Sequence, residues 1–197
     1  NTTLDGILSA EILLTSDERH LIVPLNYHGL YSYSIEGKEE WNISLNGSLS
    51  DCPLMLSDNS TLVGTWAGWL YRISYSGSIL WKTELPGHID TLPLLVEDRI
   101  FVTSRNNLTC LDIDGNIIWN LPGGNRSFES NPVLRKDGDI AIGGNELYRI
   151  SQDGDFLGWA NEHEYNHNME FLLTSSGGSI VGLDFDYLSG FSEHGEY

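Results

Sequence analysis

Hydrophobic and polar residues alternate along the chain in short runs, and these runs recur in a fixed order. The stretch 70–81 holds an alternating run, a turn at Gly77 and a second run that ends in Trp81. Similar stretches occur at 30–41, 108–119 and 147–159. Alternation with a period of two is typical of half-buried β-strands, so each stretch predicts two antiparallel strands joined at a glycine.

The spacing of these stretches predicts the architecture. The tryptophans that end them are 40, 38 and 40 residues apart, and they are Trp41, Trp81, Trp119 and Trp159. Short strands repeated about every 40 residues are typical of β-propellers, in which each repeat is one blade. We therefore expect an all-β fold, a single β-propeller domain over 1–197 with about five four-stranded antiparallel blades. The expected repeats are 1–46, 47–86, 87–125, 126–166 and 167–197, the last without its outer strand.

The four tryptophans are expected to pack between blades. One blade cannot bury its own apolar faces and must pack against its neighbours. Emptying such an aromatic site by substitution with alanine is expected to cost about 3–5 kcal/mol. The phase of the tryptophans therefore predicts a structural role for them and not a cofactor site.

The repeat has a recognisable pattern, Pro-x-Leu, then Asp, Ile-x-Val-Gly, Gly-x-Leu-Tyr-x-Ile and Gly-x-x-x-Trp. It resembles the repeat of the PQQ-like (quinoprotein alcohol dehydrogenase-like) β-propeller family, and Leu70, Tyr71, Gly77 and Trp81 carry the likeness. The resemblance covers nearly the whole chain and implies the fold. It implies little about function, because the repeat carries structure.

The same resemblance gives no reason to expect an enzyme. Dehydrogenases of that superfamily carry an adjacent cysteine pair, calcium ligands and a catalytic aspartate. The two cysteines here, Cys52 and Cys110, are far apart, and no segment matches the rest of that site. We expect no catalytic residue and no bound PQQ.

The charge composition limits the classes of partner that the protein is expected to bind. The chain carries 28 acidic and 10 basic residues, for a formal net charge of −18. Because nucleic acids and anionic membranes bind through Lys and Arg, neither is an expected partner, and no apolar run is long enough for membrane insertion. The chain begins at Asn1 without an initiator Met or a signal-type segment, which suggests a processed or excised sequence.

Six Asn-x-Ser/Thr sequons predict a glycosylated protein that is extracellular, at the cell surface or periplasmic. The alternative is a β-rich surface in which Ser and Thr are simply frequent. The six asparagines are Asn1, Asn42, Asn46, Asn59, Asn107 and Asn125.

Acidic residues near the start of each innermost strand suggest a metal site. In a propeller these positions approach the axis, where converging carboxylates would recruit a cation such as Ca²⁺. The alternative is that they cap strand ends and face water. The five residues are Glu11, Asp51, Asp90, Glu129 and Glu170.

A ligand or partner site is expected at the turns between second and third strands. Exposed aromatic rings beside amide and carboxylate groups suit a sugar or a protein partner. Trp69 alternatively packs against the next blade. The candidate ligand-binding residues are Trp66, Trp69, Tyr27, His28 and Arg105.

Two other motifs favour ordinary turns or loops. The string 163–167 matches the H-E-x-x-H zinc pattern, but it falls in a link between blades, where we expect a loop. The segment 112–116 begins like a calcium loop and lacks the distal glutamate, so we expect a turn.

Together these features predict a non-enzymatic, extracytoplasmic scaffold that presents one face to a protein or glycan, or an assembly subunit that associates through its first and last blades. The alternative is a fragment or divergent member of a PQQ-like enzyme, redox or metal-dependent, with an incomplete site.

Overall fold

The computed structural model describes residues 6–26, 29–49, 53–126, 128–144, 147–160, 170–173, 179–182 and 188–191, and from 159 onward only the backbone. Within these residues the regular structure is all β, as expected. No helix of the described chain has the length and apolar character needed to cross a membrane.

Four sheets each hold four antiparallel strands paired in chain order, which confirms the predicted blades of the first four repeats. The first two sheets are β1 (Leu13–Leu14), β2 (His20–Leu25), β3 (Gly29–Ser34), β4 (Glu39–Ile43) and β5 (Leu54–Met55), β6 (Thr61–Gly64), β7 (Trp69–Ile73), β8 (Ile79–Glu84). The next two are β9 (Leu94–Val96), β10 (Arg99–Ser104), β11 (Asn107–Asp112), β12 (Ile117–Pro122) and β13 (Val133–Leu134), β14 (Ile140–Gly143), β15 (Leu147–Ile150), β16 (Phe156–Ala160).

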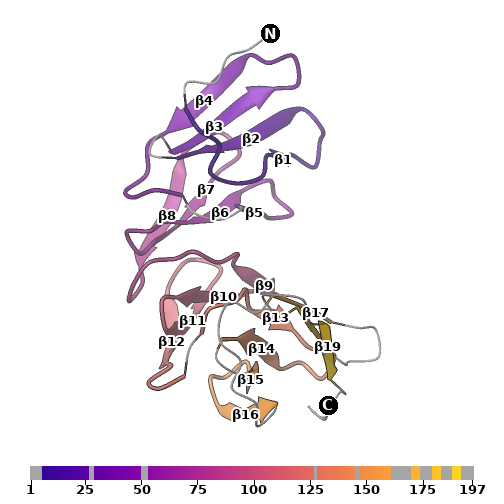
Figure 1. Cartoon of the computed structure of the whole chain (residues 1–197). Helices are drawn as coiled ribbons and strands as arrows, with labels where there is room; N and C mark the ends of the chain where they lie inside the picture. Colours follow the sequence, from indigo (N-terminus) through magenta and orange to yellow (C-terminus); the bar gives the residue numbers. More distant parts are fainter. Residues whose placement is uncertain are drawn as a thin grey trace. The chain divides into compact units, whose positions relative to one another are not determined.

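A fifth sheet has three described strands, β17 (Glu170–Leu173), β18 (Ser179–Gly182) and β19 (Leu188–Phe191). The strands fall into two compact units. The first holds β1 to β8 together with the turn 114–116, and the second holds β9 to β19 (Figure 1).

The innermost strands are shorter than the sequence suggests. The apolar residues between 6 and 14 are numerous enough for one long strand, but β1 covers Leu13–Leu14, and Leu8 forms a separate bridge to Leu25. Pro24 lies opposite the interruption and has no backbone N–H to donate to a continuous ladder.

Position within the sheet decides how much of each strand is buried. The second strands are central, and β14 is buried at every residue. The outer strands β8 and β12 alternate between exposed and half-buried residues, because one face of each packs inward and the other meets water. This explains why second strands are continuously apolar in sequence and outer strands are mixed.

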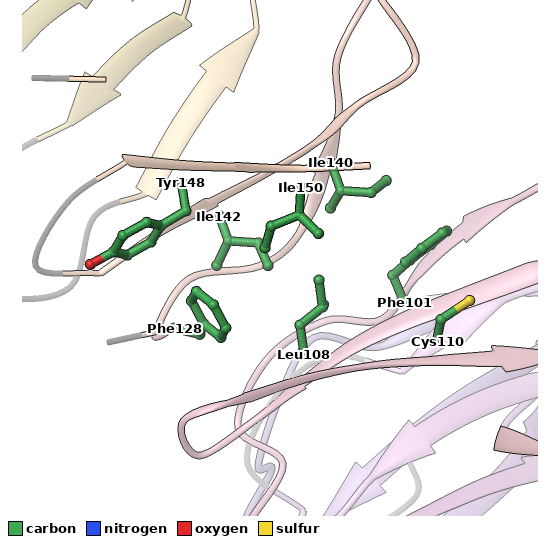
Figure 2. Packing of buried hydrophobic residues seen from close by; sticks show 8 residues of the cluster. All are labelled: Phe101, Leu108, Cys110, Phe128, Ile140, Ile142, Tyr148 and Ile150. Atoms are coloured by element: carbon green, nitrogen blue, oxygen red, sulfur yellow. The ribbon is translucent and has the colours of Figure 1, made fainter. Parts of the chain in front are cut away.

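The core of the second unit lies between its third-repeat and fourth-repeat sheets. Figure 2 shows Phe101, Leu108 and Cys110 on one side, facing side chains of β14 and β15 on the other. The latter are Ile140, Ile142, Tyr148 and Ile150, and Phe128 joins the same cluster. Burial excludes water from the Cys110 thiol and raises its pKa to about 11.

Three of the repeated tryptophans, Trp41, Trp81 and Trp119, pack on the outer-turn glycines of the following repeats, as predicted, whereas the side chain of Trp159 lies outside what the structure describes. A Cβ built on Gly77 would lie 2.6 Å from the Trp41 ring, and one on Gly115 would lie 2.5 Å from the Trp81 ring. In the second unit, a Cβ built on Gly154 would lie 3.0 Å from the Trp119 ring.

Hydrogen bonds fix these rings in place. The indole N–H of Trp41 donates to the carbonyl of Tyr75 at 2.9 Å, and that of Trp119 donates to the carbonyl of Gln152 at 3.0 Å. Each acceptor lies two residues before the glycine. The Gly-x-x-x-Trp pattern therefore encodes both the turn and the contact that joins successive sheets.

Candidate functional site

A cleft of about 630 Å³ opens in the first unit, and we call it the Trp66 cleft. Its volume is within the usual range for small-ligand or side-chain pockets. Its lining residues are Leu8, Ser9, Asn26, Ser48, Leu49, Trp66 and Asp90.

Two link segments build this cleft by pairing beside the ends of second strands. The segment around Leu8 bridges Leu25, and the backbone N–H of Ser9 donates to the carbonyl of Pro24 at 3.1 Å. In the next sheet Leu49 bridges Thr65. The cleft is therefore made by backbone that enters each sheet, with the β6–β7 turn beside it.

Trp66 lies on that turn and is the dominant exposed ring of the cleft. The backbone N–H of Trp66 donates to the carbonyl of Ser48 at 2.9 Å, and the residue is 54% exposed. The ring stacks on His88 with centroids 4.8 Å apart and planes 10° apart. One face of the indole is thereby covered, and the remaining surface is open to a ligand.

A carboxylate lies next to this aromatic pair. The Oδ2 atom of Asp90 is 3.4 Å from Nε2 of His88, and both side chains are partly exposed. The arrangement places a negative charge close to an accessible indole, which suits a ligand with a positive or hydrogen-donating group.

Two polar atoms of the lining residues are buried. Within the described chain, neither Ser9 Oγ nor Asn26 Oδ1 has a hydrogen-bond partner. Buried polar atoms usually have a partner, because leaving one unpaired costs about 1–3 kcal/mol. Both atoms are enclosed by the surrounding protein, so they do not form part of the accessible surface of the cleft.

Comparison with known proteins assigns the family. The model of the PQQ_2 family, described as "Outer membrane protein assembly factor BamB", matches residues 28–160. The chain belongs to the PQQ_2 family. This confirms the resemblance to PQQ-like propeller repeats that Leu70, Tyr71, Gly77 and Trp81 carry in the repeat pattern.

Solved structures agree on the fold of this PQQ_2 chain. BamB from Moraxella catarrhalis is similar with a TM-score of 0.70 and 13% identity, over 97% of this chain and 60% of that one. A protein of unknown function from Bacteroides caccae is similar with a TM-score of 0.58 and 12% identity, over 98% of this chain and 81% of that one. No curated protein matches the sequence. The PQQ_2 chain thus spans 60% of the length of the Moraxella BamB.

The predicted ligand-binding residues occupy different places in this PQQ_2 fold. Trp66 lines the cleft, whereas Trp69 is half-buried in the core cluster of the first unit, with Lys82 Nζ 4.7 Å from its ring centroid. Arg105 is exposed on the β10–β11 turn of the second unit, and its φ is 53°. Tyr27 and His28 lie outside the described residues. Ligand contact by any of these residues stays a prediction.

The predicted carboxylate ring also stays a prediction. Asp90 lines the cleft, and Glu11 and Glu129 are exposed. Asp51 and the side chain of Glu170 lie outside what the structure describes. Among the described residues, no three His, Cys, Asp or Glu side chains gather in a group that could hold a metal ion.

The sequons differ in accessibility. Asn42, Asn46 and Asn125 are exposed, whereas Asn59 and Asn107 are half-buried. The side-chain oxygen Oδ1 of Asn59 accepts hydrogen bonds from the backbone N–H and the hydroxyl of Ser16, at 2.9 Å and 2.7 Å. Asn1 and the H-E-x-x-H string lie outside the described residues. The segment 112–116 forms a turn after β11, as expected.

Sequence reasoning missed a set of ion pairs that repeats in the second and fourth blades. Arg72 donates to Asp58 at 2.8 Å, and Arg149 donates to Asp137 at 3.1 Å. Each arginine follows Leu-Tyr in the third strand, and each aspartate lies in the preceding hairpin. The recurring Leu-Tyr-Arg-Ile motif at 70–73 and 147–150 is the signal that could have identified them.

These pairs change the ionisation of the carboxylates. A hydrogen bond from the Ser60 hydroxyl, with a smaller effect of Arg72, lowers the pKa of Asp58. Burial acts to raise the pKa of Asp137, but hydrogen bonds from Arg135 and the backbone, with the nearby arginine charges, lower it overall. Both carboxylates are therefore held in their charged form.

A second polar cluster joins the first two sheets. The Tyr75 hydroxyl donates to Asp17 at 2.8 Å and contacts Nδ1 of His20. Hydrogen bonds from Thr15 and then from Tyr75 lower the pKa of Asp17 to about 2. None of these residues lines the Trp66 cleft, so this cluster serves packing between neighbouring sheets.

Proposed function

We propose that this chain is a non-enzymatic propeller scaffold that binds a protein partner at the Trp66 cleft. The observation that carries the proposal is the 54% exposure of Trp66 at a cleft of about 630 Å³. Tryptophan in a partly desolvated pocket is a frequent centre of binding energy in protein interfaces. A large exposed indole supported from behind by His88 is pre-organised for such contact.

The family supports a scaffold. The description of the PQQ_2 model names an outer membrane protein assembly factor, which favours a binding role over a catalytic one. The cleft supplies groups for binding, namely an indole, a carboxylate, an amide and hydroxyls.

The proposal includes the setting of the protein. We place the chain outside the cytoplasm, in the periplasm or at a cell surface, because its family description refers to an outer membrane and its sequons at Asn42, Asn46 and Asn125 are exposed. We also propose that the five repeats belong to one propeller domain, with the three-stranded β17–β19 sheet as its fifth blade.

Site-specific photocrosslinking tests this function. A benzophenone amino acid replaces Trp66 in one variant and Leu80 in a matched control, since Leu80 is also exposed, at 52%, on the outer strand β8. We expect one discrete protein adduct from position 66 in cells that make the protein, and none from position 80. Equal crosslinking from both positions, or adducts that contain glycan and no protein, would contradict the proposal.

A further inference from the structure

We propose that the Trp66 cleft accepts an arginine side chain, flanked by apolar residues, from an extended segment of the partner. This inference rests on the proposed function, because it names the chemistry of the occupant of that same cleft. It draws on the charge of the lining, the accessible indole face and an apolar residue of the lining.

The lining is complementary to a cation. Among the described residues that line the cleft, Asp90 is the charged one, and neither Lys nor Arg is present. The whole chain carries a net charge of −18, so its field favours a basic ligand over an acidic one at every stage of approach. The cleft therefore selects for positive charge both locally and at long range.

The carboxylate of the lining needs a donor. Asp90 has His88 as its near neighbour, and its side chain is partly exposed. A guanidinium has five N–H donors and no acceptor, so it can donate to this carboxylate directly. An acidic or purely apolar side chain would offer the carboxylate no donor.

The indole favours arginine over lysine. Stacking on His88 covers one face of Trp66, while the residue stays 54% exposed. A planar guanidinium can lie flat on the open face of an indole and still donate to a neighbouring carboxylate in its plane. An ammonium group is a point charge with stronger hydration and gains less from this geometry.

An apolar side chain of the lining defines the neighbours of the arginine. Leu8 lines the cleft and is 45% exposed. Exposed large apolar residues beside an indole form a surface that is stabilised when a partner covers it. The residues next to the arginine in the bound segment are therefore expected to be apolar.

A pair of peptides tests the inference on the full chain. The probes are the acetylated, amidated peptides Gly-Leu-Arg-Leu-Gly and Gly-Leu-citrulline-Leu-Gly, because citrulline keeps the shape of arginine and removes its charge. The readout is the indole N–H resonance of Trp66, assigned with Trp66→Phe. We expect saturable shifts with the arginine peptide and at least fivefold weaker binding of the citrulline peptide. Asp90→Asn should remove that difference, and Asp98→Asn, an exposed acid outside the lining, should keep it.

The outcomes separate this inference from the proposed function. Equal binding of the two peptides, or a difference that survives Asp90→Asn, would overturn the arginine assignment. Protein crosslinks from position 66 would in that case still support the proposed function. Absence of crosslinks from position 66 would remove the function, whatever the peptides do.

Discussion

The contact between Trp41 and Gly77 predicts a stability loss that can be separated into two parts. In Gly77→Ala, a Cβ would lie 2.6 Å from the Trp41 ring, and the backbone φ there is 82°. A left-handed φ costs a residue with a Cβ about 1–2 kcal/mol. Overpacking against a ring held by its hydrogen bond to Tyr75 adds about 1–3 kcal/mol. The expected loss in the free energy of unfolding is therefore about 2–5 kcal/mol.

A matched glycine isolates the contribution of packing. Gly138 has a φ of 91°, and a Cβ there would meet only the Gln152 side chain, at 3.9 Å. Gly138→Ala should therefore cost only the backbone part, about 1–2 kcal/mol. Urea titration followed by tryptophan fluorescence measures both losses in the free energy of unfolding.

A double-mutant cycle completes the test. Trp41→Leu removes the ring that the new methyl group would meet, so Gly77→Ala should cost less in that background, with a coupling of about 1–3 kcal/mol. If Gly77→Ala costs no more than Gly138→Ala, or if the cycle shows no coupling, the account of how successive sheets dock is refuted.

Three further predictions follow from other sites. Because burial raises the pKa of Cys110 to about 11, a thiol reagent at pH 8 should modify it only on unfolding, as mapped by mass spectrometry, and fast labelling of the native protein would contradict this. Tyr75→Phe should raise the pKa of Asp17 from about 2 toward 3.8, as measured by NMR titration. Charged Asp17 stabilises the fold fully above its ordinary pKa of 3.8, and this stabilisation is lost as the pH falls toward 2. An unchanged pKa in Tyr75→Phe would refute the hydrogen bond from Tyr75. In a glycosylating host, glycopeptide analysis should find a larger glycosylated fraction at Asn42 than at Asn59, whose side-chain amide oxygen accepts hydrogen bonds from Ser16. The reverse order would contradict the contact between Asn59 and Ser16.

The sequence predicted the repeating elements because their signals are local. Each Gly-x-x-x-Trp stretch contains its own turn residue and its own packing residue, so every repeat shows the same local pattern. The same regularity shows why Trp81 is structural: its ring lies against Gly115, as that of Trp41 lies against Gly77.

The cleft could not be predicted in the same way. Trp66 was an expected ligand residue, but its stacking on His88 joins positions in different segments and follows no repeat. The ion pair of Arg72 with Asp58 does recur with the Leu-Tyr-Arg-Ile motif, but the motif alone does not name the acidic partner, which lies in the preceding hairpin. Strand length was overestimated at β1, where Pro24 interrupts the ladder that apolar periodicity alone would extend.

Hydrogen–deuterium exchange with the partner captured from position 66 tests the central claim most directly. The account predicts slower exchange on binding at the backbone N–H groups of 65–68 and 88–90, which hold Trp66, His88 and Asp90, with no change in the outer strands β8 and β12. Protection confined to the outer strands, with unchanged exchange at 65–68, would contradict the claim that this cleft is where the scaffold binds its partner.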